Sequence, residues 1–165
     1  MKKLMILILL FTIMSCSDNE KMAKASFALD SQVTLAIINQ NGDDLLNPAT
    51  SNYFSLENMK LYYLVNGEKI EVYDSNMAYP RNIGLITETT PYTLGITTYD
   101  GDEDLISEEN GVKTGVSIAY LELNENVSDT IKTQWESKEG KYFVNRKVWY
   151  NGELKSVEEP FIIIK

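Results

Sequence analysis

The chain has 165 residues, with 15 basic and 24 acidic side chains and a formal net charge of −9 at pH 7. A surface of this sign repels phosphate backbones, so we expect no nucleic-acid partner. The sequence has no histidine and one cysteine. This excludes Ser-His-Asp and Cys-His catalytic arrangements and the zinc sites that use histidine or several cysteines. The length suits one domain with its own core.

Residues 1–15 have the pattern of a secretory signal. Lys2 and Lys3 follow the start, and an apolar run extends from Leu4 to Met14. The run is much shorter than the roughly 20 residues of a transmembrane helix, but it has the length of a signal-peptide core. The small residue Ser15 follows it. We therefore predict a signal peptide over residues 1–15, and an ordinary signal peptide with an incidental cysteine after it is the alternative.

Residues Ile13-Met14-Ser15-Cys16 resemble the lipobox of bacterial lipoproteins. In that family the cysteine is linked to diacylglycerol, the peptide is cut before it, and the new amino terminus is acylated. The resemblance implies that Cys16 is the lipidation site, and lipidation would also use a cysteine that has no disulfide partner. Two or three acyl chains hold a protein durably at a membrane, whereas one chain gives only marginal binding.

The residues after Cys16 bear on which membrane the anchor enters. Ser17 is not the aspartate that favours inner-membrane retention in well-studied lipoproteins, so the resemblance implies the outer membrane. The segment Ser17-Asp18-Asn19-Glu20 is similar to the export signal of surface-exposed lipoproteins of Bacteroidota. We therefore expect a lipid-anchored domain at the cell surface.

Residues 16–28 then comprise the lipidated cysteine and a flexible tether, because they are small, charged or polar and show no sustained period. The folded domain is expected over residues 29–165. Its first strand is predicted over Gln32–Asn39 and is followed by a loop over Gln40–Pro48, which is rich in Asn, Asp and Gly. Alternate residues of that strand are apolar: Val33, Leu35 and Ile37.

The dipeptide Asn66-Gly67 is the clearest turn signal in the chain. A two-residue type I′ turn at this point would place Tyr63 opposite Ile70. The same register pairs three more sets of residues: Leu61 with Val72, Tyr62 with Glu71, and Leu64 with Lys69. One face of the hairpin is then apolar, so the turn and the period-2 pattern agree. Asn151-Gly152 predicts a second hairpin, in which Trp149 would face Leu154.

Four further segments are expected to be strands. Three of them alternate apolar and polar residues: Tyr92–Tyr99 with Leu94 and Ile96, Gly115–Leu123 with Val116, Ile118 and Tyr120, and Thr130–Trp135 with Ile131, Thr133 and Trp135. Phe161–Ile164 is a continuous apolar run, which predicts a strand covered on both faces.

These elements predict an all-β protein. No window of helical length has a convincing 3.6-residue period, and the strands are separated by turns rich in Asn, Gly and Asp. We expect a single antiparallel β-sandwich of immunoglobulin-like or transthyretin-like type, after the signal peptide and the short tether. An up-and-down barrel is the alternative.

The densest acidic cluster contains Asp100, Asp102 and Asp104. Alternate aspartates on a turn can direct oxygen ligands towards one calcium ion. An EF-hand loop would need glycine at its sixth position and glutamate at its twelfth, where this chain has Leu105 and Gly111. We therefore expect at most weak calcium binding and no other cofactor. For this cluster, and for a second oxygen-rich loop, turn geometry is the favoured interpretation; the second loop contains Asn39, Asn41, Asp43 and Asp44.

Ten tyrosines and two tryptophans make the chain rich in large aromatic residues. Aromatic rings exposed on a sheet can stack against sugars. If this protein binds a glycan in that way, the candidate ligand-binding residues are Trp135, Trp149, Tyr62 and Tyr73. Aromatic residues also pack well in sandwich cores and at cross-strand positions. For Trp135 and for most of the tyrosines we favour the packing role.

Four features together resemble small uncharacterised surface-exposed lipoproteins of Bacteroidota: the lipobox, the loop Asn41–Pro48, the tyrosine-rich strand before Asn66-Gly67, and the turn Trp149-Tyr150-Asn151-Gly152. The resemblance implies the location and a β-sandwich domain, and it implies no activity. No two carboxylates are singled out by their spacing as a glycosidase pair would be, so we expect no enzyme.

Two functions follow as hypotheses. The favoured one is a non-catalytic binding module on the cell surface, for a glycan or another extracellular ligand. The alternative is a structural or accessory subunit of an outer-membrane or surface assembly. The partners are then the membrane, through the lipid anchor, and an extracellular glycan or protein. An exposed aromatic row would favour the first function, and an uncovered edge strand or an apolar patch would favour the second.

Overall fold

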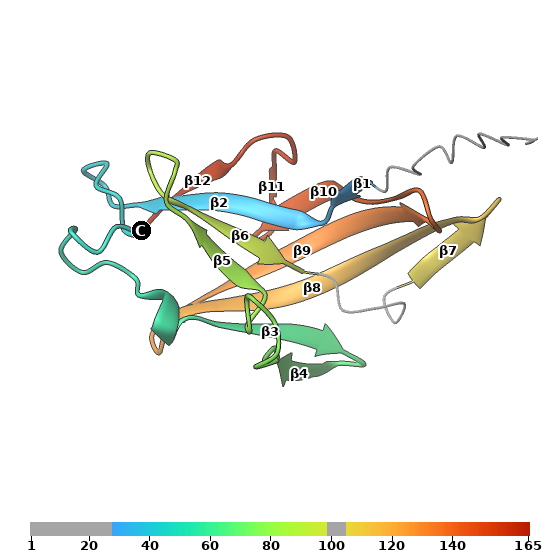
Figure 1. The fold of residues 1–165 in the computed structure, drawn as a ribbon, viewed down its shortest axis with the longest axis horizontal. Coiled ribbons are helices and arrows are strands. Elements are labelled where there is room, and N and C mark those ends of the chain that lie inside the picture. Colours follow the sequence, from blue (N-terminus) through green and yellow to red (C-terminus); the bar gives the residue numbers. More distant parts are fainter. Residues whose placement is uncertain (1–27, 99–104) are drawn as a thin grey trace, which may run out of the picture.

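The computed structural model describes residues 28–98 and 105–165, and these form an all-β sandwich of two sheets (Figure 1). The larger sheet has the strand order β1-β10-β9-β8-β3-β4, with β11 on β10 and β7 on β8. Its strands are β1 (Ala28–Asp30), β3 (Lys60–Val65), β4 (Glu68–Glu71), β7 (Leu105–Glu109), β8 (Val112–Asn124), β9 (Val127–Lys138), β10 (Tyr142–Tyr150) and β11 (Glu153–Lys155). The smaller sheet has the order β12-β2-β6-β5. Its strands are β2 (Gln32–Ile38), β5 (Ile83–Ile86), β6 (Thr93–Thr97) and β12 (Phe161–Ile164).

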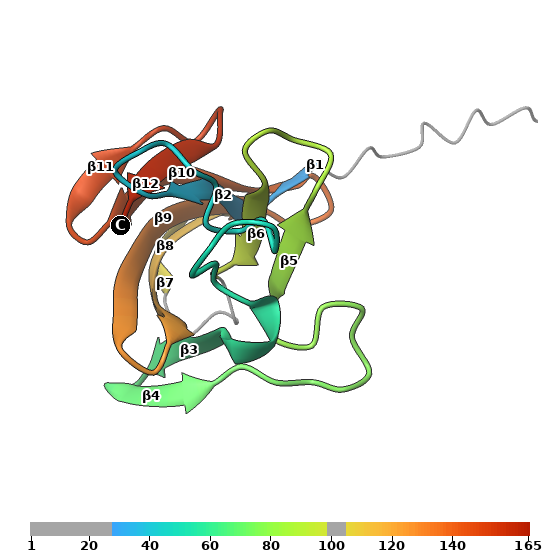
Figure 2. The ribbon, with the colours of Figure 1, turned by 90° about the vertical axis from the view of Figure 1, so that its left-hand side faces the viewer.

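The larger sheet is strongly curved and the smaller sheet faces its inner side. Figure 2 shows the larger sheet bending from β11 round to β4, with β2, β6 and β5 of the smaller sheet opposite it. The long strands β8 and β9 extend beyond the smaller sheet at one end (Figure 1). Within the described residues, the helical structure is a single 3-10 turn, η1 (Leu56–Asn58). The predicted all-β sandwich is therefore confirmed.

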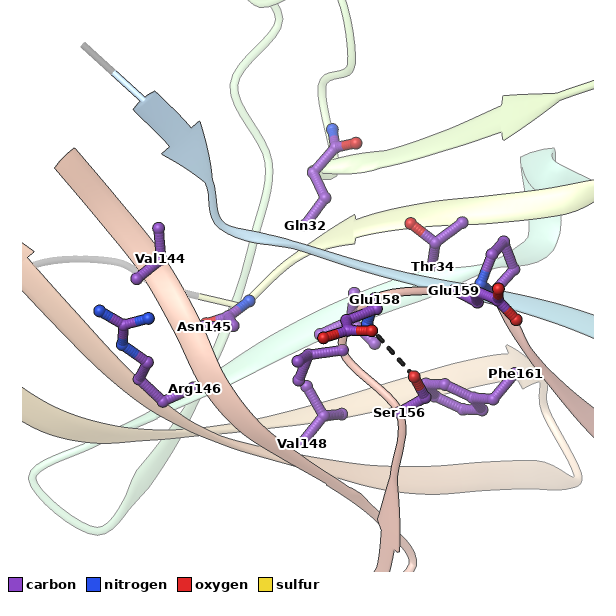
Figure 3. A pocket seen from close by; sticks show the side chains of 13 residues that line it. Gln32, Thr34, Val144, Asn145, Arg146, Val148, Ser156, Glu158, Glu159 and Phe161 are labelled. Carbon is purple, nitrogen blue, oxygen red and sulfur yellow. Dashed lines mark hydrogen bonds between the residues drawn. The ribbon is translucent and has the colours of Figure 1, made fainter.

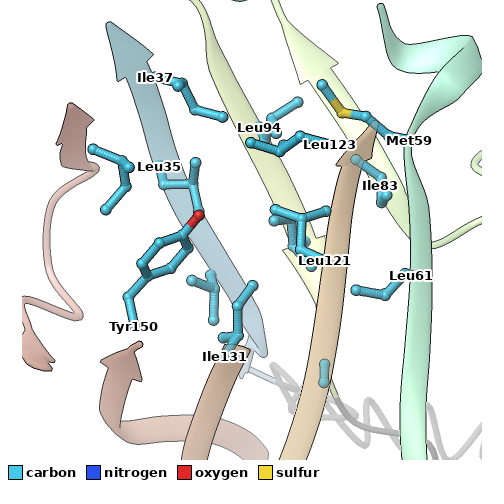
Figure 4. Packing of buried hydrophobic residues seen from close by; sticks show 14 of the residues in the cluster. Leu35, Ile37, Met59, Leu61, Ile83, Leu94, Leu121, Leu123, Ile131 and Tyr150 are labelled. Atoms are coloured by element: carbon cyan, nitrogen blue, oxygen red, sulfur yellow. The ribbon is translucent and has the colours of Figure 1, made fainter. Parts of the chain in front are cut away.

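The core lies between the inner faces of the two sheets (Figure 4). Leu35, Leu94 and Ile96 contribute from the smaller sheet, and each is fully buried. Leu61, Leu121 and Ile131 face them from the larger sheet. Burying a leucine or isoleucine side chain contributes about 1.5–3 kcal/mol, so this apolar layer is the main force that holds the sheets together.

Both predicted hairpins are confirmed with their registers. Tyr63 pairs with Ile70 across the turn at Asn66-Gly67, and Trp149 pairs with Leu154 across Asn151-Gly152. Asn66 and Gly67 have φ values of 52° and 86°, as a type I′ turn requires. The apolar face of the first hairpin is covered only in part, because Tyr63 is buried while Ile70 is 47% exposed.

In the strand predicted over Gly115–Leu123, the alternating set named from the sequence is not the set that faces the core. Val116, Ile118 and Tyr120 lie on the outer face of β8 and are half-buried. The inner face consists of the alternate residues, which are buried: Ser117, Ala119, Leu121 and Leu123. Both faces of this strand contain apolar residues, so a period-2 pattern does not decide which face is buried. In β9 the alternating residues named from the sequence, Ile131, Thr133 and Trp135, are all buried.

The prediction that Phe161–Ile164 is covered on both faces is wrong. In the described residues β12 is an edge strand that pairs only with β2, in parallel. Its inward residue Ile163 is 9% exposed, whereas Ile162 and Ile164 are 53% and 65% exposed. A second parallel pair joins β1 to β10, so the sandwich is mainly but not wholly antiparallel.

Candidate functional site

The structure separates the four aromatic residues that the sequence suggested as a binding set. Trp135 points into the sandwich, is 1% exposed, and stacks on Phe143 with 5.4 Å between ring centroids. Its indole N–H donates a hydrogen bond of 3.1 Å to the hydroxyl of Ser117. Trp135 is therefore a core residue, and its ring is not available to a ligand in solution.

Trp149 and Tyr62 lie on the outer face of the larger sheet, where both are half-buried. The ammonium group of Lys132 lies 5.2 Å from the Trp149 ring. Tyr62 pairs with Tyr120, and the ammonium group of Lys69 lies 3.7 Å from the Tyr120 ring. Cation–π contacts of this kind stabilise exposed sheets by about 0.5–1 kcal/mol. Since lysines lie over Trp149 and over Tyr120, the cross-strand neighbour of Tyr62, a packing role explains the outer face without a ligand.

Tyr73 lies apart from the other three, just after β4, and is 62% exposed. It lines a groove with a volume of about 310 Å³, which we call the β4 groove; its walls are formed by Tyr63, Ile70, Glu71, Val72, Tyr73, Asp74, Met77, Pro80 and Asn82. The guanidinium group of Arg81 lies 5.7 Å from the Tyr73 ring. The groove thus combines the exposed ring of Tyr73 with other apolar side chains.

The proposed calcium ligands Asp100, Asp102 and Asp104 lie outside the described residues. Within residues 28–98 and 105–165, no group of three Asp, Glu or Cys side chains is placed to hold a metal ion. In the second oxygen-rich loop, the side chain of Asn39 accepts hydrogen bonds from the backbone N–H groups of Asn41 and Asp43, both at 2.9 Å. Turn geometry therefore explains that loop.

A polar cleft lies between β2 and β10, and we call it the β2–β10 cleft (Figure 3). It has a volume of about 350 Å³, within the range of small-ligand sites. β12 pairs with β2 only from Leu35 to Ile38, so the earlier part of β2 has no β12 residue beside it. The segment 156–160, which joins β11 to β12, forms the remaining wall together with Phe161.

A β-bulge in β10 sets the direction of the side chains at the cleft. The register between β10 and β9 shifts between Asn145 and Lys147, which makes Arg146 the extra residue. As a result Arg146 and Lys147 are both exposed, while Asn145 and Val148 are buried on the inner side. Without the bulge, the alternation of the strand would place Asn145 and Val148 on opposite faces.

Asn145 is a buried polar residue in the lining of the cleft. It is 8% exposed, and its side-chain N–H donates a hydrogen bond of 2.9 Å to the backbone carbonyl of Ser31. Its carbonyl oxygen, Oδ1, has no hydrogen-bond partner in the described part of the chain. A buried acceptor without a donor costs about 1–3 kcal/mol, so a donor that reaches it from the cleft would gain binding energy.

The charges around the cleft are unbalanced towards negative. Glu158 and Glu159 line it from the connecting segment, and the backbone N–H of Glu158 donates to the Ser156 hydroxyl at 3.2 Å. The guanidinium group of Arg146 is already paired with Glu136 at 2.7 Å. Hydrogen bonds from Arg146 and Tyr142 lower the pKa of Glu136, while the bond to Glu136 raises the pKa of Arg146. The cleft is thus rich in acceptors, and Arg146, the one basic residue among those that line it, is already paired.

Reasoning from the sequence did not find this cleft. Asn145, Glu158 and Phe161 lie in different elements, and no motif joins them. The one sequence feature at the cleft is the pair Glu158-Glu159 directly before Pro160. Such a pair indicates an acidic turn and is too common to indicate a ligand site. The inward direction of Asn145 depends on a bulge, and a bulge has no sequence signature here.

Comparison of the chain with protein-family models, with curated proteins and with solved structures found no match. Of the helical segments in the described residues, none has the length and apolar character to cross a bilayer.

Proposed function

We propose that the chain is a lipid-anchored envelope protein whose sandwich domain is a non-catalytic binding module for a hydroxyl-rich ligand, such as the end of a glycan, held in the β2–β10 cleft. The supporting observation is the buried carbonyl oxygen of Asn145, which has no donor of its own. The carboxylates of Glu158 and Glu159 add further acceptors at the rim. Sugar hydroxyls are donors that match such a set.

The wall that contains the carboxylates also includes an aromatic ring, which supports the same ligand class. Phe161 lines the cleft and is held by an edge-to-face contact with Tyr150, at 5.7 Å between ring centroids. An aromatic wall beside a few convergent polar groups is the usual composition of small-ligand sites. A sugar has apolar C–H faces and polar edges, so it can use both parts of the cleft.

The test of the ligand is a glycan-panel binding assay with the full chain in detergent. We expect at least one hydroxyl-rich glycan to bind, and the double variant Glu158→Gln, Glu159→Gln to weaken its affinity about tenfold, because hydrogen bonds to charged acceptors contribute about 1.5–3 kcal/mol. The matched control is Glu68→Gln, an exposed acid on β4 outside the cleft. Equal binding by the double variant and wild type would refute the cleft as the site.

The anchor is tested separately at Cys16. A lipidated cysteine predicts that the wild-type chain takes up labelled palmitate and fractionates with membranes. Cys16→Ser should lose both properties, since the thioether cannot form. A wild-type chain without label, or a Cys16→Ser chain that remains in the membrane fraction, would contradict lipid anchoring.

The alternative function, an accessory subunit of an envelope assembly, has one observation in its favour. This is the exposed apolar surface at the β4 groove, where Ile70, Tyr73 and Met77 are 47%, 62% and 56% exposed. Contiguous apolar surface of this kind often marks a protein–protein contact.

A further inference from the structure

The β4 groove combines three exposed apolar side chains with an edge strand. Ile70 belongs to β4, and Tyr73 and Met77 belong to the segment that follows it. Single exposed apolar residues are common on protein surfaces, but these three line one groove. Met77 adds adaptability, because the methionine side chain is unbranched and polarizable.

The open edge of β4 offers backbone hydrogen-bonding groups beside this groove. In the described strands, β4 pairs only with β3 and stands at the margin of its sheet (Figure 1). The N–H of Val72 donates to the carbonyl of Leu61 at 2.8 Å. Because bonded pairs alternate in antiparallel sheets, Ile70 also faces β3, whereas the backbone groups of Lys69 and Glu71 face away from it. An unpaired edge of this kind can accept an extra strand.

The charges at this edge specify what kind of strand would fit. Glu68 and Glu71 lie on β4 and Asp74 lies in the groove wall, and none of the three forms an ion pair with a residue that the structure describes. Two basic residues nearby contact rings: Lys69 lies over Tyr120 and Arg81 lies near Tyr73. The edge therefore has unpaired negative charge, which complements a basic partner.

The alternating side-chain directions of β4 define which residue types an added strand would need at each position. Ile70 and Val72 share the side of the strand that faces the groove. Glu71 alternates with them, pairs with Tyr62 across the ladder and borders the groove at the strand edge. An antiparallel strand added at the edge would place one residue opposite each of these positions. The best match is apolar opposite Val72, basic opposite Glu71, apolar opposite Ile70, neutral opposite Lys69 and basic opposite Glu68.

We propose that the β4 edge and groove bind an extended basic segment of a partner protein, with the order apolar, basic, apolar, neutral, basic. The apolar side chains enter the groove between Ile70 and Met77, and the basic side chains pair with Glu71 and Glu68. A second copy of this chain is disfavoured as the occupant, because each copy has a net charge of −9 and two copies repel one another. The proposal is independent of the ligand in the β2–β10 cleft.

The test uses the full chain in detergent and a synthetic peptide of about ten residues that repeats this pattern twice with valine, lysine and threonine. We expect binding to be weakened about tenfold by Glu68→Lys with Glu71→Lys and several-fold by Met77→Ser. The control Glu125→Lys makes the same type of charge change in the turn between β8 and β9 and should leave binding unchanged. Thermal melting of each variant verifies that it is folded.

Hydrogen exchange gives the decisive readout, because only an added strand changes specific amides. Peptide binding should protect the amides of Lys69 and Glu71, while the amide of Ile70 is already protected by β3. The proposal is overturned if the peptide does not bind, if a matched glutamate peptide binds equally well, or if the two amides stay unprotected. If the amides of Lys69 and Glu71 become more protected as the protein concentration rises in the absence of peptide, the occupant is a second copy of the chain. This result would also overturn the proposal.

Discussion

The ammonium group of Lys165 lies 2.6 Å from a carboxylate oxygen of Asp129, and this ion pair joins the end of β12 to β9 in the opposite sheet. Asp129 is 4% exposed and also accepts hydrogen bonds from the hydroxyl of Tyr150 and the side-chain amide of Asn151, both at 2.7 Å. Burial raises the pKa of Asp129, but the three donors outweigh it and hold the pKa below its ordinary value. The group fastens the two sheets at one end of the sandwich.

Replacing Asp129 should therefore destabilise the fold in a pH-dependent way. Asp129→Asn should cost about 1.5–3 kcal/mol at pH 7, the range for hydrogen bonds to charged groups. Since about 1 kcal/mol shifts Tm by 2–4 °C at this size, melting curves resolve the loss. A carboxylate with a lowered folded-state pKa stabilises the fold above its unfolded pKa, and this contribution is lost as the pH falls through the folded pKa.

The Tm difference between wild type and Asp129→Asn should accordingly be large at pH 7 and shrink below about pH 4, where the unfolded carboxyl titrates. The control Glu125→Gln removes an exposed acid and should change Tm little at either pH. A Tm difference for Asp129→Asn that is constant from pH 7 to pH 3 would argue against an ionised, donor-bound Asp129.

The turn at Asn66-Gly67 gives a second prediction. Gly67 has a φ of 86°, which is an outlier conformation for β-branched residues, so Gly67→Val should cost on the order of 1 kcal/mol or more. No heavy atom outside residues 66–68 lies within 4 Å of the position that a Cβ would take, so the cost would come from the backbone and not from a clash with the rest of the chain. Glu68→Val adds the same side chain at the neighbouring strand position and should be close to neutral. Equal stability of the two variants, measured by denaturant unfolding, would contradict the type I′ turn.

The two tryptophans should report different environments. Trp135 is buried in the sandwich and Trp149 is half-buried on the outer face. In the variant Trp149→Phe, the remaining Trp135 should emit at short wavelength and resist quenching by iodide. In Trp135→Phe, the remaining Trp149 should emit at longer wavelength and be quenched more readily. The opposite order in the two variants would show that the faces of the larger sheet are assigned wrongly.

The acidic cluster Asp100, Asp102 and Asp104 remains a sequence prediction, because it lies outside the described residues. Incomplete extracellular calcium sites bind at about 10⁻⁴–10⁻³ M, so micromolar calcium should leave Tm unchanged. Calcium at 100 times its dissociation constant would add about 2.7 kcal/mol to the free energy of unfolding. Comparing the Tm with calcium and with a chelator therefore measures the effect. A rise of many degrees at micromolar calcium, abolished by Asp102→Asn, would reveal a strong site.

The sequence was informative where structure depends on neighbouring residues. Asn-Gly turns impose positive φ values and so determine both the turn type and the pairing of the flanking strands. Tyr63 opposite Ile70 and Trp149 opposite Leu154 could therefore be predicted correctly. Strand positions were likewise recovered for β2, β6 and β9, because alternation is a local property.

Features that depend on distant packing could not be predicted. Val116 and Leu121 are both apolar, and only the position of the smaller sheet decides which of them is buried. An apolar run such as Phe161–Ile164 indicates a strand but does not show whether it lies at an edge. The cleft needs Asn145 turned inward by a bulge and Glu158 brought next to it by a separate segment, and neither event has a local signal.

The most direct test of the binding role is to map a bound glycan on the isotope-labelled full chain by nuclear magnetic resonance. The ligand should be the strongest binder in the glycan panel. We expect the largest shift changes at the side-chain amide of Asn145 and at the backbone amides of Glu158 and Glu159, because these groups line the β2–β10 cleft. Changes confined to Trp149 and Tyr62 on the outer face, with Asn145 unaffected, would contradict the proposed site.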